Sequence, residues 1–569
     1  MNRAIAIVAS TLILVTSGFS FSRNPEAGRW ESGNDFPVFL RLSPAFRFEP
    51  ELRRARVDRK RSGGAEDDSG RDEGKRFQPS PRGWRAFIEC GTIMGVSQAN
   101  YWRRYIDWVE DWQFKFNWDD QTRRLFTGDG WRFDSNSFFT NWGHGVSGAI
   151  YYNTFRTNYH SWSRSLLFAS LASFYWELLV EWREVISIND NIFTTIGGFP
   201  VGEVLFQTGS FLQSRTSPFA RIFGGLLNPI LAFNRWLDRK RPFADPVFAQ
   251  HDFRFFAGHR SGENPAGEQQ QGFAEFGLSA DLVRVPGFGL PGGFSQWRAD
   301  ILSSYLDIRL LLGAHGLQEY EILARTMPWG WAWQDLTPGT DHDVCGHSLL
   351  AGLVTAFELY GQRQYWEYDR KDPFFRPPDY DQIPLPTQFS DKYCMIHLGG
   401  PRVEWRYHGR GFHVKTAAET TLDFGMIGAY ALNDYTSPQF NSLLTAAVDG
   451  PLAGMKSTLA NYGYYYGLGL TASLEVVLRM DPGVEWSAWF RTWVSNSIEG
   501  LDRFDEDIDD SMNIRDSRSR LGTSLGYRIP GTPIQMRLTY EHVSRRGRMA
   551  GIISRERDSR LSMHLCFGL

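Results

Sequence analysis

The sequence contains only four cysteines in 569 residues: Cys90, Cys345, Cys394 and Cys566. They are widely separated and form no C-x-x-C pair, so the spacings of zinc ribbons and of thioredoxin-like redox motifs are absent. An exported protein could join Cys345 to Cys394 in a disulfide, but the spacing alone does not establish that bond. Free or buried thiols are the simpler expectation.

A long apolar run and a strong net charge are also missing. The apolar stretches at 4–15 and 165–180 are both shorter than the run of about 20 residues that a membrane-spanning helix needs. The formal net charge is −3, so no nucleic-acid partner is expected. No H-E-x-x-H motif occurs, and Gly197-Gly198 does not follow a strand into a phosphate-binding helix. The sequence therefore predicts no cofactor, and it leaves the question of a metal open.

Aromatic residues and glycines are abundant instead. Aromatics make up 15% of the chain and there are 56 glycines, yet the mean hydropathy is −0.36. This combination is typical of a membrane β-barrel, in which only alternate residues face lipid. An aromatic-rich soluble α/β protein would have a similar composition, so the choice between them depends on the order of the residues.

The first 82 residues have the pattern of an export signal and a linker. A positive start at Arg3 precedes the apolar run Ala4–Val15, and small residues follow at Gly18, Ser20 and Ser22. This predicts a cleaved signal peptide at 1–22, with an uncleaved anchor as the alternative. Residues 23–82 are predicted to be a disordered charged linker, because the stretch 51–76 has too few apolar residues to offset its ordering entropy.

Residues 83–244 are predicted to form a helical domain. The stretch 165–180 is apolar nearly all round, which predicts a buried helix. Ser187 offers an N-cap for a further apolar segment that reaches about Leu212. Within that segment, Gly197, Gly198 and Gly202 would let a neighbouring backbone approach closely.

Residues 245–569 change to a two-residue period. Apolar and polar residues alternate over 412–426 and 462–478, and Asp481-Pro-Gly483 then turns the chain into another alternating stretch. The chain ends on the alternating segment 561–569. About twelve such strands are predicted. Short turns at 480–483 and 529–533 would be periplasmic, and the long polar segments 369–386, 433–451 and 498–513 would be extracellular.

The predicted fold class is therefore an α+β membrane protein, with an N-terminal α-helical domain followed by a C-terminal antiparallel transmembrane β-barrel of about twelve strands. Such a protein would lie in the cell outer membrane, in contact with outer-membrane lipid, after insertion by the barrel-assembly machinery. A soluble β-sandwich fed by a helical domain is the alternative.

The region from about Trp142 to Trp236 resembles an uncharacterised family of bacterial envelope proteins that carries a domain of unknown function (number 3943). The matching positions are His144 with Gly148, Tyr151-Tyr152-Asn153, Arg156, Trp176-Glu177, Glu181, Ser187-Ile-Asn189-Asp190, Thr195-Ile-Gly197-Gly198, Gly202-Glu203, Asn228-Pro229 and Phe233-Asn234-Arg235. The resemblance implies a signal peptide, a helical block and a strand-rich C-terminal half. It implies no activity, because the family has none established.

Polar residues inside the apolar helices are the first candidate site. Charges on buried helices are costly unless they are paired, which makes their presence informative. One interpretation is a general acid/base or divalent-cation site, for zinc or manganese, made by His144, Glu177, Glu181 and Asp190. The simpler interpretation is a structural network, in which Arg156 pairs with glutamates such as Glu203 and Asn189 or Asp190 caps a helix. Both remain open.

The barrel half offers two more candidates. His413, Lys415, Glu419 and Asp423 would point into the lumen, where they would set pore selectivity or form cross-strand ion pairs. Asp341-His342-Asp343, His347 and Ser348 lie near the start of a strand. His347 and Ser348 would point to opposite faces and so would not form a catalytic dyad.

Three functions fit these expectations. The first is a transport or channel-like protein, or one that maintains the envelope, whose helical domain lies below the barrel in the periplasm or plugs its lumen. The second is a membrane-embedded enzyme that acts on envelope lipid or glycan through the His/Glu/Asp cluster. The third is an envelope-organising protein that binds a partner. The small-molecule or lipid substrate is not specified by the sequence.

Overall fold

The structure is a computed structural model that describes residues 80–108, 117–238, 250–262, 273–313, 316–339, 344–362, 391–434, 450, 452–455, 457–498, 500–501 and 512–568. The predicted signal peptide, nearly all of the predicted linker, the segment 369–386 and Asp341-His342-Asp343 lie outside the described residues.

Helices occupy the chain between Gly83 and Leu237. Serine or asparagine side chains cap most of them; Ser187, for example, accepts a hydrogen bond from the backbone N–H of Asp190 at 3.2 Å. A two-stranded parallel pair joins β1 to β2 between these helices. The elements are α2 (Gly83–Trp108), α3 (Trp118–Phe126), β1 (Trp131–Arg132), α4 (Phe138–Arg156), α5 (Trp162–Tyr175), the π-helical turn η4 (Trp176–Val180), β2 (Ile186–Ser187), α6 (Ile188–Ile192), the π-helical turn η5 (Phe193–Gly197), α7 (Gly198–Gln213), α8 (Pro218–Leu227) and α9 (Pro229–Leu237).

Helix α4 packs closely against η5 and α7 through glycines. A Cβ atom on Gly148 would lie 1.7 Å from the carbonyl oxygen of Thr194, and one on Gly198 would lie 2.7 Å from the backbone of Gly148. Only glycine fits where two backbones approach this closely. The sequence anticipated the close approach at Gly198, and α4 supplies the opposing glycine.

Twelve strands form a closed antiparallel ring, which confirms the predicted fold class. The last strand pairs with the first, β15 with β3, and β7 pairs with both β6 and β8. A short strand, β5, pairs with the far end of the long β7. The strands are β3 (Gln250–Gly262), β4 (Phe273–Val283), β5 (Gly292–Arg298), β6 (Ser303–Gly313), β7 (Gly316–Pro338), β8 (Val344–Gln362), β9 (Lys392–Gly409), β10 (Phe412–Gly428), β11 (Tyr464–Met480), β12 (Val484–Ser497), β13 (Arg515–Arg528), β14 (Ile534–Met549) and β15 (Ile552–Gly568).

The ring has two different ends. The tight connections 410–411, 481–483 and 529–533 and the end of β15 share one end, which we call the short-turn end. The opposite end, which we call the loop end, carries the longer connections 429–463 and 498–514 and the tight turn 550–551. One long connection, 284–302, which contains β5, lies at the short-turn end. In single-chain outer-membrane barrels the short turns face the periplasm and the long loops face outward.

Side chains alternate between the two faces of the wall. On β15, Arg560, Ser562 and His564 are buried inside the ring. The outward residues between them are apolar, and Leu561 and Met563 are 47% and 58% exposed. A polar interior and an apolar exterior are the arrangement that a barrel in lipid requires.

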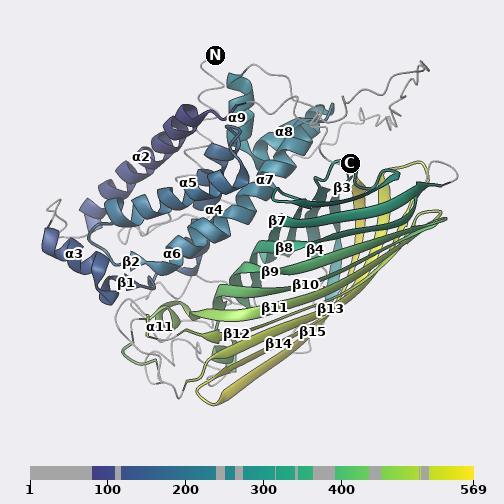
Figure 1. Ribbon diagram of the computed structural model, residues 1–569. Helices are drawn as coiled ribbons and strands as arrows, with labels where there is room; N and C mark the ends of the chain where they lie inside the picture. The colour runs from purple at the N-terminus through teal and green to yellow at the C-terminus, as the bar shows by residue number, and fades with distance from the viewer. Residues whose placement is uncertain are drawn as a thin grey trace, which may run out of the picture. The chain divides into compact units, whose positions relative to one another are not determined.

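The helical domain rests on the outward face of this wall (Figure 1). Near the loop end, the Phe133 ring packs on Phe424 and Tyr466 of the wall, with centroids 5.9 and 4.8 Å apart. Towards the short-turn end, α7 and α8 join one hydrophobic cluster with outward residues of β3, β4, β6 and β7. None of the described helical residues lines the cavity of the lumen.

The helical domain was expected to lie below the barrel or to plug its lumen, but its described helices lie on the outer face of the wall and not in the lumen. The contact surface of the helices is apolar, and it matches the outward apolar residues of the strands. The short-turn half of the interior is lined mostly by charged side chains, which offer apolar helices no complementary surface.

Helix α5 differs from its prediction as a buried helix. Its residues Leu167 and Leu171 are 55% and 53% exposed, and Phe174 is 39% exposed. The helix buries only one side against α4 and α2, which leaves the other apolar side uncovered by described residues. Among the described helices, none has both the length and the apolar character needed to cross a membrane.

The glycine contact predicts opposite effects for two glycine-to-alanine changes. Gly148→Ala places a methyl group against the Thr194 carbonyl, and we expect it to lower the unfolding free energy of the helical domain by about 2 kcal/mol. Gly91→Ala, on the exposed side of α2 with nothing within 4 Å of its Cβ, should instead raise it by about 0.5–1 kcal/mol. Urea unfolding of the solubilised protein, followed by helical circular dichroism, measures both. If Gly148→Ala had the same unfolding free energy as the wild-type protein, the close packing of α4 on η5 would be contradicted.

Candidate functional sites in the lumen and the helical domain

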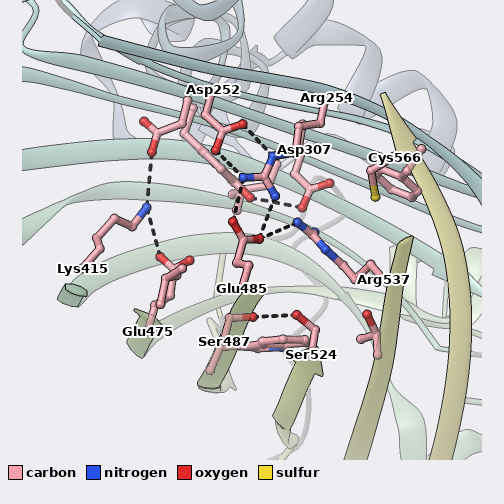
Figure 2. A pocket seen from close by; sticks show the side chains of 18 of the residues that line it. Asp252, Arg254, Asp307, Lys415, Glu475, Glu485, Ser487, Ser524, Arg537 and Cys566 are labelled. Atoms are coloured by element: carbon pink, nitrogen blue, oxygen red, sulfur yellow. Dashed lines mark hydrogen bonds and ion pairs between the residues drawn. The ribbon is translucent and has the colours of Figure 1, made fainter. Parts of the chain in front are cut away.

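The lumen contains a cavity of about 690 Å³. Inward side chains of the strands line it, and they are mostly charged: eleven arginines and one lysine face eight carboxylates. Figure 2 shows the part in which Arg254 pairs with Asp252 and Glu485, and Arg537 pairs with the same Glu485, at 2.6–2.8 Å. A smaller cavity of about 330 Å³ at the short-turn end shares Asp252 and Arg254 with the first. The larger cavity, which we call the chamber, therefore lies within the short-turn half of the ring.

The four residues predicted to face the lumen all point inward. His413 and Lys415 line the cavity, and the Lys415 ammonium lies 3.3 Å from Asp281 and 3.6 Å from Glu475. Glu419 and Asp423 lie deeper and are buried in ion pairs. Glu419 accepts hydrogen bonds from Arg325 and Arg402, and Asp423 contacts His397 at 2.6 Å.

The inward arginines of the barrel were not predicted from the sequence. Their signal was present, because arginine recurs at alternate positions of β13, at Arg518 and Arg520. The expectation that the chain has no G-x-S-x-G run is wrong, because Gly522–Gly526 is one. It lies inside β13, where Ser524 contacts the Ser487 hydroxyl at 2.8 Å. A nucleophile elbow requires a sharp strand-to-helix turn, so this serine does not have that geometry.

The loop end of the lumen is filled by an apolar cluster. It is formed by inward residues of the strands and by a folded connection that we call the loop cap: η9 (Tyr430–Asp434), residues 452–455 and α11 (Thr458–Tyr462). Leu452 and Leu459 of the cap are fully buried against wall residues such as Trp493 and Met549. The cap thus closes the ring on the side opposite the chamber.

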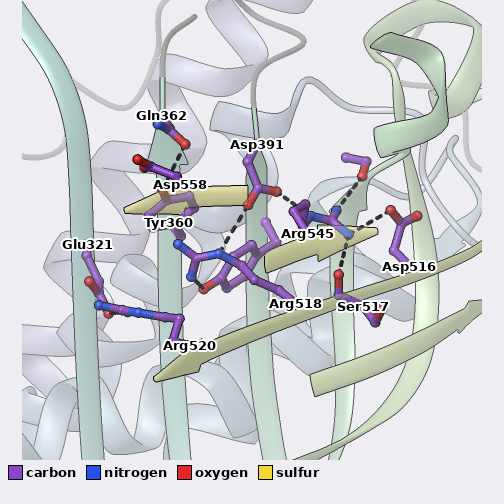
Figure 3. A network of polar contacts seen from close by, with 12 residues as sticks. Glu321, Tyr360, Gln362, Asp391, Asp516, Ser517, Arg518, Arg520, Arg545 and Asp558 are labelled. Atoms are coloured by element: carbon purple, nitrogen blue, oxygen red, sulfur yellow. Dashed lines mark hydrogen bonds and ion pairs between the residues drawn. The ribbon is translucent and has the colours of Figure 1, made fainter. Parts of the chain in front are cut away.

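Arg545 holds this cap to the wall (Figure 3). Its guanidinium donates to Asp391 and Asp516 at 2.7 and 2.8 Å and to the carbonyl oxygen of Gly428 at 3.1 Å. It also lies over the Tyr430 ring, 5.0 Å from the centroid. The backbone N–H of Tyr430 donates to the same Asp516 at 3.2 Å. One buried ion-pair network therefore ties the beginning of the cap to two strands.

The helical domain gathers the predicted catalytic candidates at its contact with the barrel. His144 Nε2 lies 3.7 Å from Asp190, which is too long for a hydrogen bond. Glu177 is buried and accepts the Ser187 backbone N–H at 3.0 Å. Glu181 accepts the indole N–H of Trp176 at 2.8 Å. The structure thus places the four residues in one region, where they also adjoin Asp134.

Burial and like charge dominate the electrostatics of this cluster. Burial and the neighbouring Asp190 raise the pKa of Glu177 to about 9. Burial and Glu177 likewise hold the pKa of Glu181 well above its usual range. Burial lowers the pKa of His144 to about 4, against the opposing effect of Asp134. The surroundings therefore favour the protonated form of the two glutamates and the neutral form of the imidazole.

The residues with predicted structural roles form hydrogen-bond networks around this cluster. Asn189 accepts the backbone N–H of Asp134 and donates to Asn141. The Asn141 amide in turn donates to the hydroxyls of Tyr464 and Tyr466 on the barrel, at 2.7 and 2.6 Å. This chain of contacts joins the helical cluster to the wall.

Arg156 and Glu203 form a separate buried pair, with the guanidinium nitrogens 2.8 and 3.1 Å from the carboxylate. Burial alone would raise the pKa of Glu203, but Arg156 holds it below its ordinary value. No group of three or more His, Cys, Asp or Glu side chains suited to hold a metal ion occurs in the described part of the chain.

His347 and Ser348 lie on opposite sides of β8. The His347 ring packs against Trp405 and Tyr407 on the outer face, whereas Ser348 is fully buried. They do not form a dyad. All four cysteines are free thiols, Cys345 and Cys394 included.

Comparison with known proteins supports the architecture. Residues 130–230 match the domain of unknown function DUF3943, which confirms the resemblance over the helices that precede the barrel. No curated protein sequence matches the chain.

Solved outer-membrane structures are similar to it only in fold. The β domain of the Bordetella autotransporter BrkA is 9% identical over 55% of this chain and 97% of that one, with a TM-score of 0.19. The outer-membrane channel DcaP of Acinetobacter baumannii is 9% identical over 56% and 96%, with a TM-score of 0.18. OmpT of Vibrio cholerae is 4% identical over 56% and 99%, with a TM-score of 0.22. Such low scores carry no information about function.

The protonated state of Glu177 predicts an unusual pH dependence. Its folded pKa of about 9 lies above the ordinary value of 4.5, so its contribution to stability is complete below about pH 4.5 and is lost as the pH rises towards 9. Glu177→Gln keeps an acceptor for the Ser187 N–H and replaces the titratable carboxyl group with an amide that does not titrate. We expect this variant to lose less stability than wild type between pH 5 and pH 9, as measured by thermal unfolding of the solubilised protein. The exposed Asp120→Asn change is the matched carboxylate-to-amide control. Parallel profiles for wild type and Glu177→Gln would show that the cluster is not protonated.

Proposed function

We propose that the protein is an outer-membrane channel whose lumen is closed at the loop end by its own loop cap and opens when that cap is displaced. The observation that carries this proposal is the contrast between the two halves of the lumen. The short-turn half holds a charged chamber of about 690 Å³, and the loop half is filled by an apolar cluster.

Placement in the outer membrane is supported by the wall itself. The closed ring leaves no strand edge unpaired, and it has an exposed apolar exterior on β11 to β15. The short turns would then face the periplasm, and the chamber would communicate with that side. The helical domain would brace the wall from outside and leave the lumen to the loop cap.

The charge of the chamber supports a preference for anions. Its lining has more arginine and lysine side chains than carboxylates. Rings of basic side chains are the usual means by which a pore favours anions. The solute that passes is therefore expected to be small, polar and negatively charged.

Displacement of the cap provides the test. Leu459 is fully buried in the cap cluster, so Leu459→Asp buries a charge there and should drive the cap out of the lumen. In planar bilayers we expect the wild-type protein to be mostly closed and Leu459→Asp to conduct, with a reversal potential that favours anions. Asn461→Asp adds the same charge at an exposed position of the same helix and is the matched control.

Two results would contradict the gated channel. Steady conductance by the wild-type protein would mean that the cap does not close the lumen. The second result is a Leu459→Asp variant that does not conduct although heat-modifiable electrophoretic mobility shows that it is folded. It would mean that the ion pairs inside the ring close the lumen without the cap.

A second candidate function, a membrane-embedded enzyme acting on envelope lipid or glycan, is favoured by one specific observation. His144, Glu177, Glu181 and Asp190 are gathered in one buried region, with neutral acids beside a neutral imidazole. Protonated carboxyl groups beside a base are suited to general acid/base hydrolysis. The network of Asn141 and Asn189 would then orient the cluster against the wall.

This alternative is tested on lipids and glycans. Envelope extracts are incubated with wild type, His144→Ala, Glu181→Gln and the control Asp120→Asn, and the products are followed by mass spectrometry. Turnover by wild type and Asp120→Asn, with none by the two folded site variants, would establish the enzyme. If the extracts are unchanged by every folded protein, or if the site variants do not fold, the cluster is structural.

A further inference from the structure

A group of arginines stands on the outer face of the wall near the loop end. It consists of residues on three adjacent strands, all of them exposed, and we call it the arginine patch. Its members are Arg515 of β13, Arg546 and Arg548 of β14, and Arg555 and Arg557 of β15.

Like charges face each other directly within the patch. The strand register places Arg515 opposite Arg548, and Arg546 opposite Arg555. Like charges at directly opposed positions of a sheet destabilise it. Among the described residues, no carboxylate lies within ion-pair distance of these five guanidinium groups. The inward arginines of the same strands differ, because Arg518, Arg520, Arg545 and Arg560 each pair with a carboxylate.

The patch begins just beyond the apolar belt of the wall. On β15 the last exposed apolar residue before it is Leu561, and Arg557 lies four residues further towards the loop end. At about 3.3 Å per residue this is about 13 Å along the strand, or about 10 Å along the membrane normal for a strand tilted by about 40°. Headgroups occupy about 5–8 Å on each side of the hydrocarbon. The flexible arginine side chains span the remaining distance.

We propose that the arginine patch binds the phosphate groups of the anionic glycolipid in the outer leaflet of the membrane. Guanidinium groups bind phosphate through paired, charge-assisted hydrogen bonds, which would neutralise the facing charges. The supporting observations are the charge complementarity, the position beyond the apolar belt and the lack of a described carboxylate partner. This interaction does not depend on the proposed channel activity.

The test compares two double variants of the full-length protein. Arg546→Gln with Arg555→Gln removes one facing pair from the patch. Arg410→Gln with Arg528→Gln removes two exposed arginines at the short-turn end and serves as the matched control. Binding of a bisphosphorylated glucosamine glycolipid to the detergent-solubilised protein is measured at low salt, with folding checked by heat-modifiable mobility. Each arginine near an anionic surface contributes about fivefold to affinity, so the patch variant should bind about 25-fold more weakly and the control as tightly as wild type.

Dephosphorylated glycolipid and inorganic phosphate distinguish the source of the phosphate. The proposal predicts that dephosphorylated glycolipid binds wild type at least as weakly as the phosphorylated form binds the patch variant, because that variant keeps three of the five arginines. It also predicts that millimolar inorganic phosphate competes poorly. Undiminished binding by the folded patch variant would overturn it, as would equal binding of the dephosphorylated lipid. Saturation of the patch by inorganic phosphate at glycolipid concentrations would show a free-anion site and would also overturn it.

Discussion

Closure of the strand ring is the constraint on which the rest of this structure depends. Once β15 pairs with β3 and β7 with β8, every strand of the ring has a neighbour on both sides, and the backbone needs no partner from solvent or lipid. Closure also fixes which residues face inward. Charged side chains are then crowded into a narrow interior, where each needs a counter-charge at the same level. The pairs of Glu419 with Arg402 and of Arg545 with Asp516 satisfy that need.

The interior is consequently organised in layers. A chamber at the short-turn end is bounded by paired charges, and beyond it the ring changes from polar to apolar where the loop cap enters. Arg545 lies at the boundary between the polar and apolar parts of the interior. It contacts carboxylates on one side and the rings of Tyr430 and Trp493 on another. Breaking a buried pair of this kind costs far more than an exposed one contributes, because it leaves a charge without a partner. The cap is therefore held by one buried ion-pair network in addition to its apolar contacts with the wall.

The sequence predicted the architecture but not how the helices dock. Two-residue alternation identified the strands and the polar interior, and the total of about twelve was right. The position of the helical domain was not predictable from alternation, since Leu422 and Phe424 share the outer face of β10 and have the same character. Leu422 is 61% exposed, whereas Phe424 is covered by the helices and is 2% exposed. Apolar residues mark a surface that avoids water, and they do not say whether lipid or protein covers it.

The polar sites were predictable to different degrees. The helical candidates were identified because charge is rare in apolar helices, whereas Asp134, which lies between elements, and the uncharged Asn141 were overlooked. The arginines of the barrel were harder, because Arg545 and Arg546 are neighbours with opposite surroundings: one is buried in the cap network and the other is exposed on the outer wall. Only the register of the strands separates their roles.

The order of the chain also bears on how the protein is assembled. The helical domain comes first, but the surface on which it rests is built later from β3 to β11. Until those strands pair, apolar side chains of the helical domain such as Phe193 and Phe211 have no wall to cover them. The strands that come last in the chain, β12 to β15, carry exposed outward apolar residues, and the ring closes between β15 and β3. The strand that closes the ring, β3, is therefore also one that carries the helices, since the Phe253 ring packs against Phe211 of α7.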